Sequence, residues 1–290
     1  MGNWHTRRLT SFLKKMKNII YTFYEAPVDW EDDYGRVSLP RMREYAEKIN
    51  ADFKVVNFDN LYPPIVEKVD KIFKEKKYPH QQWLHFWKCT ISSMFLNHEF
   101  LNSKYERMAI LDADIYIAKH AKNIFEDQEL KVGMSMLELD DTPYKKHMQY
   151  DINLFYGTEV DKCYYSPILV SDRESSSYLV ENFVSDEEFL KAAESLWYID
   201  EPRGMVNDEY VMENKKAPRI AAFMEQNLYT YIFHKFNMKI NPIDRLKWLD
   251  GARYVKNDDH NHRASMYHFP GPMKKLFFDE ETLKAIDESL

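Results

Sequence analysis

The chain has 290 residues, of which 44% are hydrophobic and 15% aromatic, enough to bury a sizeable core as one large domain or two closely fused lobes. The net charge is −7 and no basic stripe runs through the body of the chain, so we expect no nucleic-acid partner. The two cysteines, Cys89 and Cys163, exclude a disulfide framework and a cysteine-rich zinc site. Without a secretory signal or an apolar run of about 18 residues, the sequence predicts a cytoplasmic protein.

Residues 1–16 are expected to form a basic N-terminal extension outside the fold. Positions 7, 8, 14, 15 and 17 are basic, with Leu9, Phe12 and Leu13 between them. Two readings stay open for residues 1–17: a solvated leader, or an amphipathic helix that touches a membrane surface. The first six residues also fit the loose pattern for N-myristoylation.

Strands and helices alternate along the rest of the chain. β-Branched and aromatic residues predict a first strand at 18–24, and Pro40 fits the first turn of a helix over 39–50. A strand at 53–58, a helix over about 83–101 and a buried strand at 107–111 follow. Further strands are expected at 131–137 and 166–170, and helices at 185–196 and 217–236. This alternation favours an α/β fold with a mostly parallel sheet.

The sequence offers no glycine-rich loop for binding phosphate. Its seven glycines are scattered, and neither a Walker A loop nor a G-x-G-x-x-G pattern can be written from them. A nucleotide diphosphate would therefore need another source of positive charge, and a divalent cation held by carboxylates is the obvious substitute.

Asp112 and Asp114 can hold such a cation. They follow the apolar strand residues 108–111, and ligands of open α/β sheets lie at the carboxyl ends of strands. If the chain turns where the strand ends, both carboxylates can reach one ion, directly or through water. Ala113 between them is small enough to let a ligand approach. The alternative is a solvated turn that happens to carry two aspartates.

Two motifs resemble a known family. Residues 105–117, Tyr-Glu-Arg-Met-Ala-Ile-Leu-Asp-Ala-Asp-Ile-Tyr-Ile, resemble the LDADxxV segment of GT-A glycosyltransferases, most of all the glycogenin-like family with its bacterial lipopolysaccharide galactosyl- and glucosyltransferases. Residues 268–274, His-Phe-Pro-Gly-Pro-Met-Lys, fit that family's C-terminal H-x-x-G-x-x-K pattern. The resemblance implies Mn²⁺ (or Mg²⁺) held by Asp112, Asp114 and His268, with Lys274 on the donor diphosphate and Gly271 allowing close approach.

The resemblance also implies the architecture: an α/β fold of GT-A type, a single Rossmann-like mixed sheet flanked by helices, with nucleotide and acceptor lobes. The GT-A domain would span 17–275, with the nucleotide-sugar lobe at about 17–130, the acceptor lobe at 131–255 and a site-closing tail motif at 256–275. Residues 276–290 would form a C-terminal helix.

The match is incomplete at several positions. Lys275-Leu276 stands where the family often has Pro-Trp, so Lys275 could assist or replace Lys274. The family's DQDxLN segment is matched weakly by residues 207–212, which would place Asp208 and Glu209 near the transferred sugar; the alternative is the acidic first turn of a helix.

Three further residues are candidates for donor binding. Thr22 and Tyr24, at the end of the first strand, are placed to meet the nucleoside base, with core or rim packing as the alternative. Lys88 resembles a basic residue that faces the donor in some relatives, although a surface lysine would look the same.

Three functions remain open. The leading one is metal-dependent transfer of a sugar from a nucleotide-sugar, expected to be a UDP-sugar, to a hydroxyl of a glycan, glycolipid or protein, with retention of configuration. The second is a haloacid-dehalogenase-type phosphatase with Asp112 as nucleophile and Asp114 as acid/base. The third is a catalytically inactive GT-A scaffold.

Overall fold

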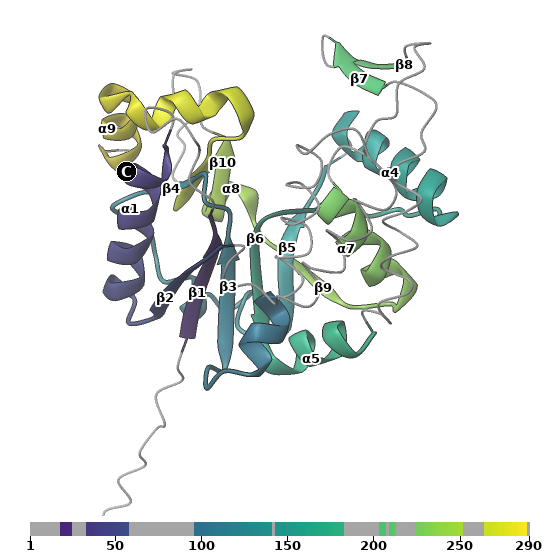
Figure 1. Cartoon of the computed structure of the whole chain (residues 1–290), viewed down its shortest axis with the longest axis horizontal. Coiled ribbons are helices and arrows are strands. Elements are labelled where there is room, and N and C mark those ends of the chain that lie inside the picture. The colour runs from purple at the N-terminus through teal and green to yellow at the C-terminus, as the bar shows by residue number, and fades with distance from the viewer. Residues whose placement is uncertain are drawn as a thin grey trace, which may run out of the picture.

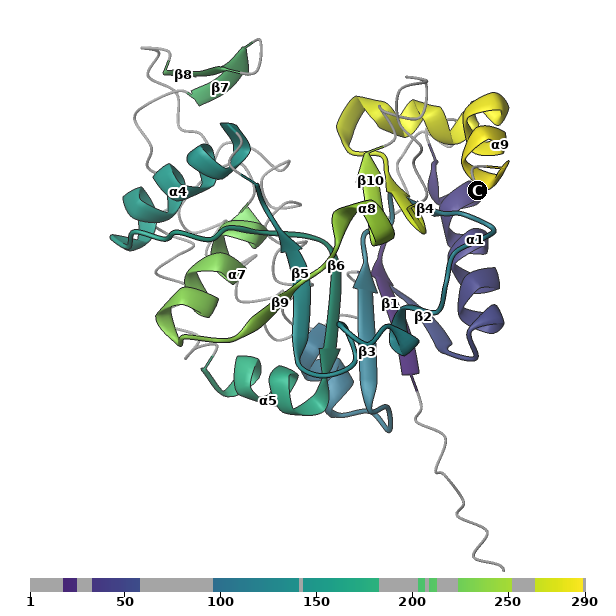
Figure 2. The same ribbon diagram turned by 180° about the vertical axis from the view of Figure 1, so that it is seen from behind.

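The computed structural model describes residues 18–24, 33–57, 96–140, 143–182, 203–206, 209–212, 224–251 and 264–288. These residues form an α/β structure around a central six-stranded sheet, with helices on both of its faces (Figure 1; Figure 2 gives the view from behind). The predicted extension 1–16 and the predicted helix 185–196 lie outside the described residues. The division into lobes near residue 130 stays a prediction.

The central sheet is mixed, as the GT-A resemblance implies. Its strand order is β2-β1-β3-β6-β5-β9. The strands are β1 (Asn18–Phe23), β2 (Asp52–Val56), β3 (Arg107–Leu111), β5 (Met134–Glu138), β6 (Tyr164–Asp172) and β9 (Ile240–Pro242). Only β6 runs against its neighbours β3 and β5, whereas the other described pairs are parallel. The carboxyl ends of β1, β3, β5 and β9 therefore meet at one edge of the sheet.

The apolar run in β3 is explained by burial on both faces. All five of its residues are buried. Met108 and Ile110 pack into a core with Leu228 and Ile232 of α7 (Met224–Lys235), on the face that also holds α5 (Arg173–Asn182). Ala109 and Leu111 point the other way, into a core with Met42, Tyr45 and Ala46 of α1 (Gly35–Lys48). An alternating strand would have left one face in water.

A second, three-stranded sheet brings distant parts of the chain together. Its order is β10-β11-β4, from β10 (Leu249–Gly251), β11 (Met266–His268) and β4 (Ile115–Ile117). β11 pairs antiparallel with β4, so that His268 lies opposite Ile115. The chain then continues through the 3₁₀ helix η5 (Gly271–Phe278) into the C-terminal helix α9 (Glu280–Glu288). The late histidine motif is thus fixed beside the segment that follows β3.

Helix boundaries depart from the sequence prediction in two ways. α1 begins at Gly35, four residues before the predicted start, and Pro40 lies inside it. Pro40 has no N–H to donate to the carbonyl four residues earlier, and it lies on the exposed side of the helix. α4 (Pro143–Tyr156) and α5 were not predicted. Asp172, the last residue of β6, caps the N-terminus of α5 by accepting from Ser175 N at 2.8 Å.

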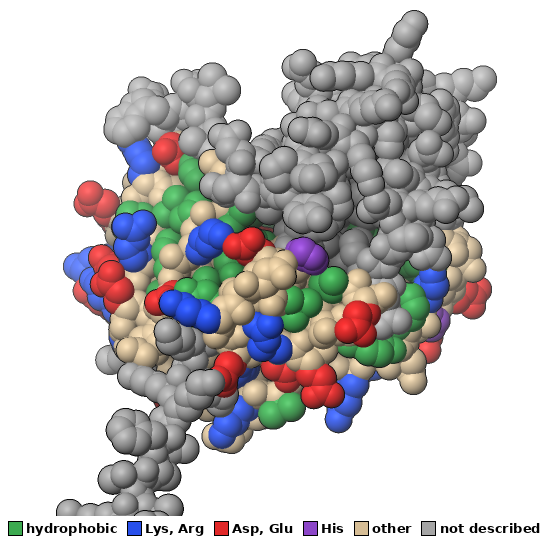
Figure 3. Space-filling view, turned by 60° about the horizontal axis from the view of Figure 1, so that its bottom comes forward, with side chains coloured by type: hydrophobic (Ala, Val, Ile, Leu, Met, Phe, Trp, Pro, Cys, Tyr) green, Lys and Arg blue, Asp and Glu red, His purple; other side chains and the backbone are tan. Residues whose placement is uncertain are grey.

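The remaining described elements are short. Residues 96–101 are helical, η3 (Ile124–Glu126) is one 3₁₀ turn, α8 (Arg245–Trp248) precedes β10, and β7 (Arg203–Val206) forms a hairpin with β8 (Glu209–Met212). No described helix combines the length and the apolar character needed to cross a lipid bilayer. On the face seen in Figure 3, acidic and basic side chains are interspersed among the coloured residues.

Asp127 anchors α8 and so supports the sheet that carries His268. Its carboxylate accepts from Trp248 Nε1 at 2.8 Å and from Glu129 N at 2.9 Å, and Lys247 Nζ lies 2.5 Å away. Burial alone would raise the pKa of Asp127, but these partners outweigh it and lower the pKa below its ordinary value.

We expect Asp127→Asn to lower the free energy of unfolding by about 1–2 kcal/mol at pH 7, mainly through the buried hydrogen bonds, since Lys247 is partly exposed. A depressed carboxyl pKa contributes stability above the unfolded value of about 3.9 and loses it as the pH falls through the folded value. The gap between wild type and variant should therefore narrow below about pH 4. Urea unfolding from pH 3 to pH 7 measures this, and a gap that does not depend on pH would contradict the assignment.

Candidate functional site

A turn after β3 brings the two aspartates to one side of the chain. Asp112 N donates to Pro167 O on β6 at 2.9 Å, which extends the sheet by one residue. Ile115 N then donates to Asp112 O at 3.1 Å and closes a tight turn. Asp114 O accepts from Phe269 N at 2.9 Å, which ties the turn to the C-terminal motif. Ala113 is buried within the turn.

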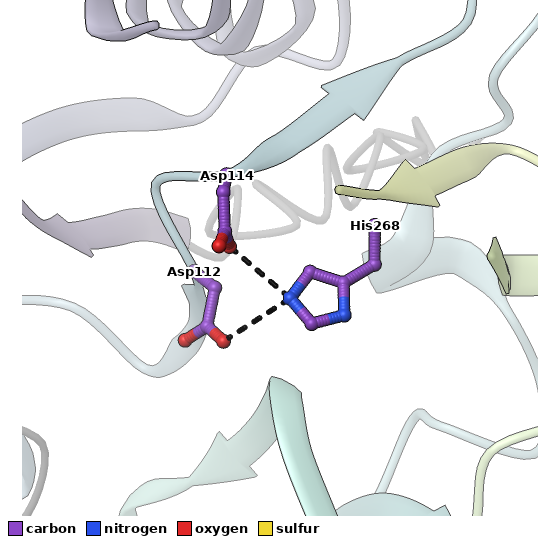
Figure 4. A group of neighbouring side chains, drawn as sticks. All are labelled: Asp112, Asp114 and His268. Carbon is purple, nitrogen blue, oxygen red and sulfur yellow. Dashed lines mark hydrogen bonds and ion pairs between the residues drawn. The ribbon is translucent and has the colours of Figure 1, made fainter. Parts of the chain in front are cut away.

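His268 completes a group of three possible metal ligands. Its Nε2 lies 3.1 Å from Asp114 Oδ1 and 3.8 Å from Asp112 Oδ2. One ligand atom from each of the three residues lies within 4.8 Å of the others. Figure 4 shows the two carboxylates and the imidazole pointing toward one another from the turn after β3 and from the end of β11. The sequence prediction that these three residues meet is confirmed.

The donor set and its spacing fit a divalent cation. Two carboxylates and an imidazole supply the O and N ligands that Mn²⁺ accepts. Neighbouring ligands of an octahedral ion with bonds of about 2.1 Å stand about 3 Å apart, close to the 3.1 Å between His268 Nε2 and Asp114 Oδ1. His268 is buried, whereas the Asp112 side chain is 39% exposed, so the group is accessible from the Asp112 side.

The electrostatics keep Asp114 ionised. Burial alone would raise the pKa of Asp114, but the hydrogen bond and charge of His268 and the ammonium of Lys274 together lower it below its ordinary value. A carboxylate that is charged at neutral pH is ready to bind a cation. The pKa of Tyr165 is raised, first by burial and then by the charges of Asp112 and Asp114, so its hydroxyl keeps its hydrogen.

Lys274 joins the group from η5, whereas Lys275 does not. The Lys274 ammonium lies 3.2 Å from Asp114 Oδ2 and 4.6 Å from the centre of the Tyr34 ring. Gly271 begins the same 3₁₀ helix. Lys275 is exposed. Of the two lysines left open by the sequence, the structure brings Lys274 to the aspartates.

The two residues expected at the nucleoside base, Thr22 and Tyr24, differ in exposure and in their contacts. Thr22 is fully buried in β1, and its Oγ1 has no hydrogen-bond partner among the described residues. Tyr24 donates to Asp33, and its ring meets Tyr34 edge to face with centroids 5.5 Å apart. The Tyr34 ring also contacts the ammonium of Lys274, which in turn pairs with Asp114. Tyr24 is therefore connected to the aspartates through Tyr34 and Lys274.

Tyr34 and Tyr165 are two site neighbours that the sequence analysis missed. Tyr34 immediately precedes α1, and Tyr165 lies in β6, where its hydroxyl is 2.9 Å from His268 Nδ1. Neither belongs to a motif. Only the folded chain places them beside residues far away in sequence.

Three predicted site residues are not tested. Lys88 and Asp208 lie outside the described residues. Glu209 begins β8, so the alternative that it belongs to the first turn of a helix is wrong for Glu209–Met212. The catalytic roles expected for Asp208 and Glu209 remain predictions.

Comparison with known proteins identifies the fold. No protein-family model and no curated protein matches the sequence. Among solved structures, the galactosyltransferase LgtC in complex with donor and acceptor sugar analogs superposes with a TM-score of 0.50 at 10% identity, over 93% of this chain and 96% of that one. The WbbM bifunctional glycosyltransferase gives a TM-score of 0.50 at 12% identity, over 95% of this chain and 50% of that one. Together with the mixed sheet, these likenesses show that the chain has the GT-A glycosyltransferase fold.

Proposed function

We propose that this protein is a metal-dependent glycosyltransferase that moves a sugar from a nucleotide-sugar, a UDP-sugar in the first instance, to an acceptor hydroxyl. One observation carries the proposal: Asp112, Asp114 and His268 converge, with Lys274 beside them, at the carboxyl-end edge of a GT-A sheet. The fold by itself would not be enough, because one fold hosts many functions.

Each residue has a distinct part in this proposal. A cation held by Asp112, Asp114 and His268 would supply Lewis-acid stabilisation of the departing diphosphate. Lys274 is within reach of the same place and adds positive charge as that diphosphate leaves. A glycine-cradle loop is missing from the sequence, so these charges take over the neutralisation that such a loop provides elsewhere.

The finer assignments rest on the family resemblance. They are retention of configuration, Asp208 and Glu209 near the transferred sugar, Lys88 on the donor, and Thr22 and Tyr24 at the nucleoside base. The acceptor is proposed to be a glycan, glycolipid or protein hydroxyl. The contact between Tyr24 and Tyr34 supports an aromatic surface on the base side.

The decisive experiment is a panel of UDP- and GDP-sugars with Mn²⁺, scored by thermal stabilisation and by release of free nucleotide. We expect one UDP-sugar to raise the melting temperature only when Mn²⁺ is present and to be hydrolysed slowly without acceptor. A phosphatase would instead release phosphate from a generic phosphoester, and an inactive scaffold would bind donor without hydrolysing it. Either result would replace the proposal.

Lys274→Ala should raise the donor KM about tenfold to a hundredfold, since a hydrogen bond from a charged group is worth about 1.5–3 kcal/mol. The acceptor KM should change little. Lys275→Ala is the matched control, because this neighbour is exposed and should behave like wild type. Initial rates over a donor series at fixed Mn²⁺ measure both variants. If Lys275→Ala produced the donor effect and Lys274→Ala did not, the assignment would be reversed.

A further inference from the structure

A tyrosine on β6 bonds the inner nitrogen of the His268 ring. The Tyr165 hydroxyl lies 2.9 Å from His268 Nδ1, while Nε2 of the same ring faces Asp114 at 3.1 Å and Asp112 at 3.8 Å. The two rings are tilted by 58° with centroids 5.6 Å apart, so the contact is made through the hydroxyl and not by stacking. Both nitrogens of a buried imidazole are thus occupied.

An irregularity in the sheet aims Tyr165 at the site. Between β5 and β6 the register jumps: Met136 pairs with Leu169, but the next residue, Leu137, pairs with Tyr165. Pro167 lies among the β6 residues 166–168, which the β5–β6 register skips. As a proline it has no N–H to donate to a neighbouring strand. On the side that faces β3, the Pro167 carbonyl accepts from Asp112 N. Bulges commonly re-aim side chains beside active sites, and Tyr165 is the residue at which pairing with β5 resumes.

The chemistry of a phenol suits both states of this histidine. In the metal-free protein Nε2 can donate to Asp114, and the hydroxyl can then donate to Nδ1. A histidine that binds a cation through Nε2 carries its hydrogen on Nδ1, and the phenol oxygen can accept it. The tyrosine hydroxyl can donate a hydrogen bond to Nδ1 or accept one from it, whereas a phenylalanine side chain can do neither.

We propose that Tyr165 is a positioning residue, whose hydroxyl holds the His268 ring with Nε2 directed at Asp112 and Asp114. The inference deepens the proposed function and rests on it, since it assumes that these three residues bind a cation. Partners of metal-bound histidines fix the ring and its tautomer, and their loss weakens metal binding about tenfold to a hundredfold.

The test is the affinity for Mn²⁺ alone, measured by electron paramagnetic resonance of the free ion, in wild type and Tyr165→Phe. Tyr45→Phe is the matched control: its hydroxyl bonds Lys122 O at 2.7 Å and Ile124 N at 3.0 Å, so the variant also loses buried hydrogen bonds on another element. We expect about tenfold to hundredfold weaker Mn²⁺ binding in Tyr165→Phe and wild-type binding in Tyr45→Phe.

A second readout separates positioning from packing. The ring ¹⁵N NMR signals of His268, identified by their loss in His268→Ala, should change pattern in metal-free Tyr165→Phe but not in Tyr45→Phe. Wild-type Mn²⁺ affinity in Tyr165→Phe would overturn the inference and leave the proposed function standing. Weaker affinity with an unchanged ring pattern would also overturn it, because the tyrosine would then act through packing. If wild type itself bound no Mn²⁺, the proposed function would fail and this inference with it.

Discussion

Asp114→Asn is expected to reduce Mn²⁺-dependent sugar transfer at least about a hundredfold while the protein stays folded. Asp114 is the centre of the site: its carboxylate meets His268 on one oxygen and Lys274 on the other. Asparagine keeps the shape and the backbone bond to Phe269 but removes the charge that a cation requires. Donor hydrolysis and transfer at saturating Mn²⁺, with melting curves in parallel, measure the effect.

Asp112→Asn and His268→Ala should show the same loss, because the three residues form one ligand group. Asp161→Asn is the control, since that aspartate is exposed on the turn before β6 and should transfer at the wild-type rate. Transfer at the wild-type rate by all three site variants would remove the assigned site. Loss of folding in all three would point to a structural role for the cluster instead.

The second large effect concerns stability: Arg107→Met should lower the free energy of unfolding by about 3–5 kcal/mol. Arg107 is buried at the start of β3, where its guanidinium donates to Phe125 O at 2.7 Å and to Leu130 O. Burial lowers the pKa of Arg107, and the charge of Asp172 partly restores it. Removing the guanidinium takes the donor away from two buried carbonyls and removes a nearby positive charge that favours ionised Asp172.

Urea unfolding at pH 7 measures this loss, which is a large share of the stability of a typical domain. Arg107→Lys should lose less, since it keeps the charge but cannot reach both carbonyls in a fork. Arg43→Met on the exposed side of α1 is the control and should change stability by less than about 0.5 kcal/mol. A small effect at Arg107, similar to that at Arg43, would show that the buried guanidinium is not needed for the fold.

Sequence and structure agree most closely around the turn that carries Asp112 and Asp114. The strand predicted at 107–111 coincides with β3, because the unbroken apolar run 108–111 is a local signal of a buried central strand. The meeting of Asp112 and Asp114 with His268 was expected from two motifs and is found in the structure. By contrast, α5 was missed because its capping residue, Asp172, is itself the last residue of the strand β6.

Local sequence therefore determined the buried strand, the two acids after it and the motif that carries His268. Tertiary structure alone decided that Lys274 and not Lys275 joins Asp114, and that Tyr165 holds the inner nitrogen of His268. The physical reason is distance along the chain. A strand or a motif can be recognised from residues that are neighbours in sequence. The contacts of Lys274 and Tyr165 arise only when sheet pairing brings β6, β11 and the turn after β3 to the same edge.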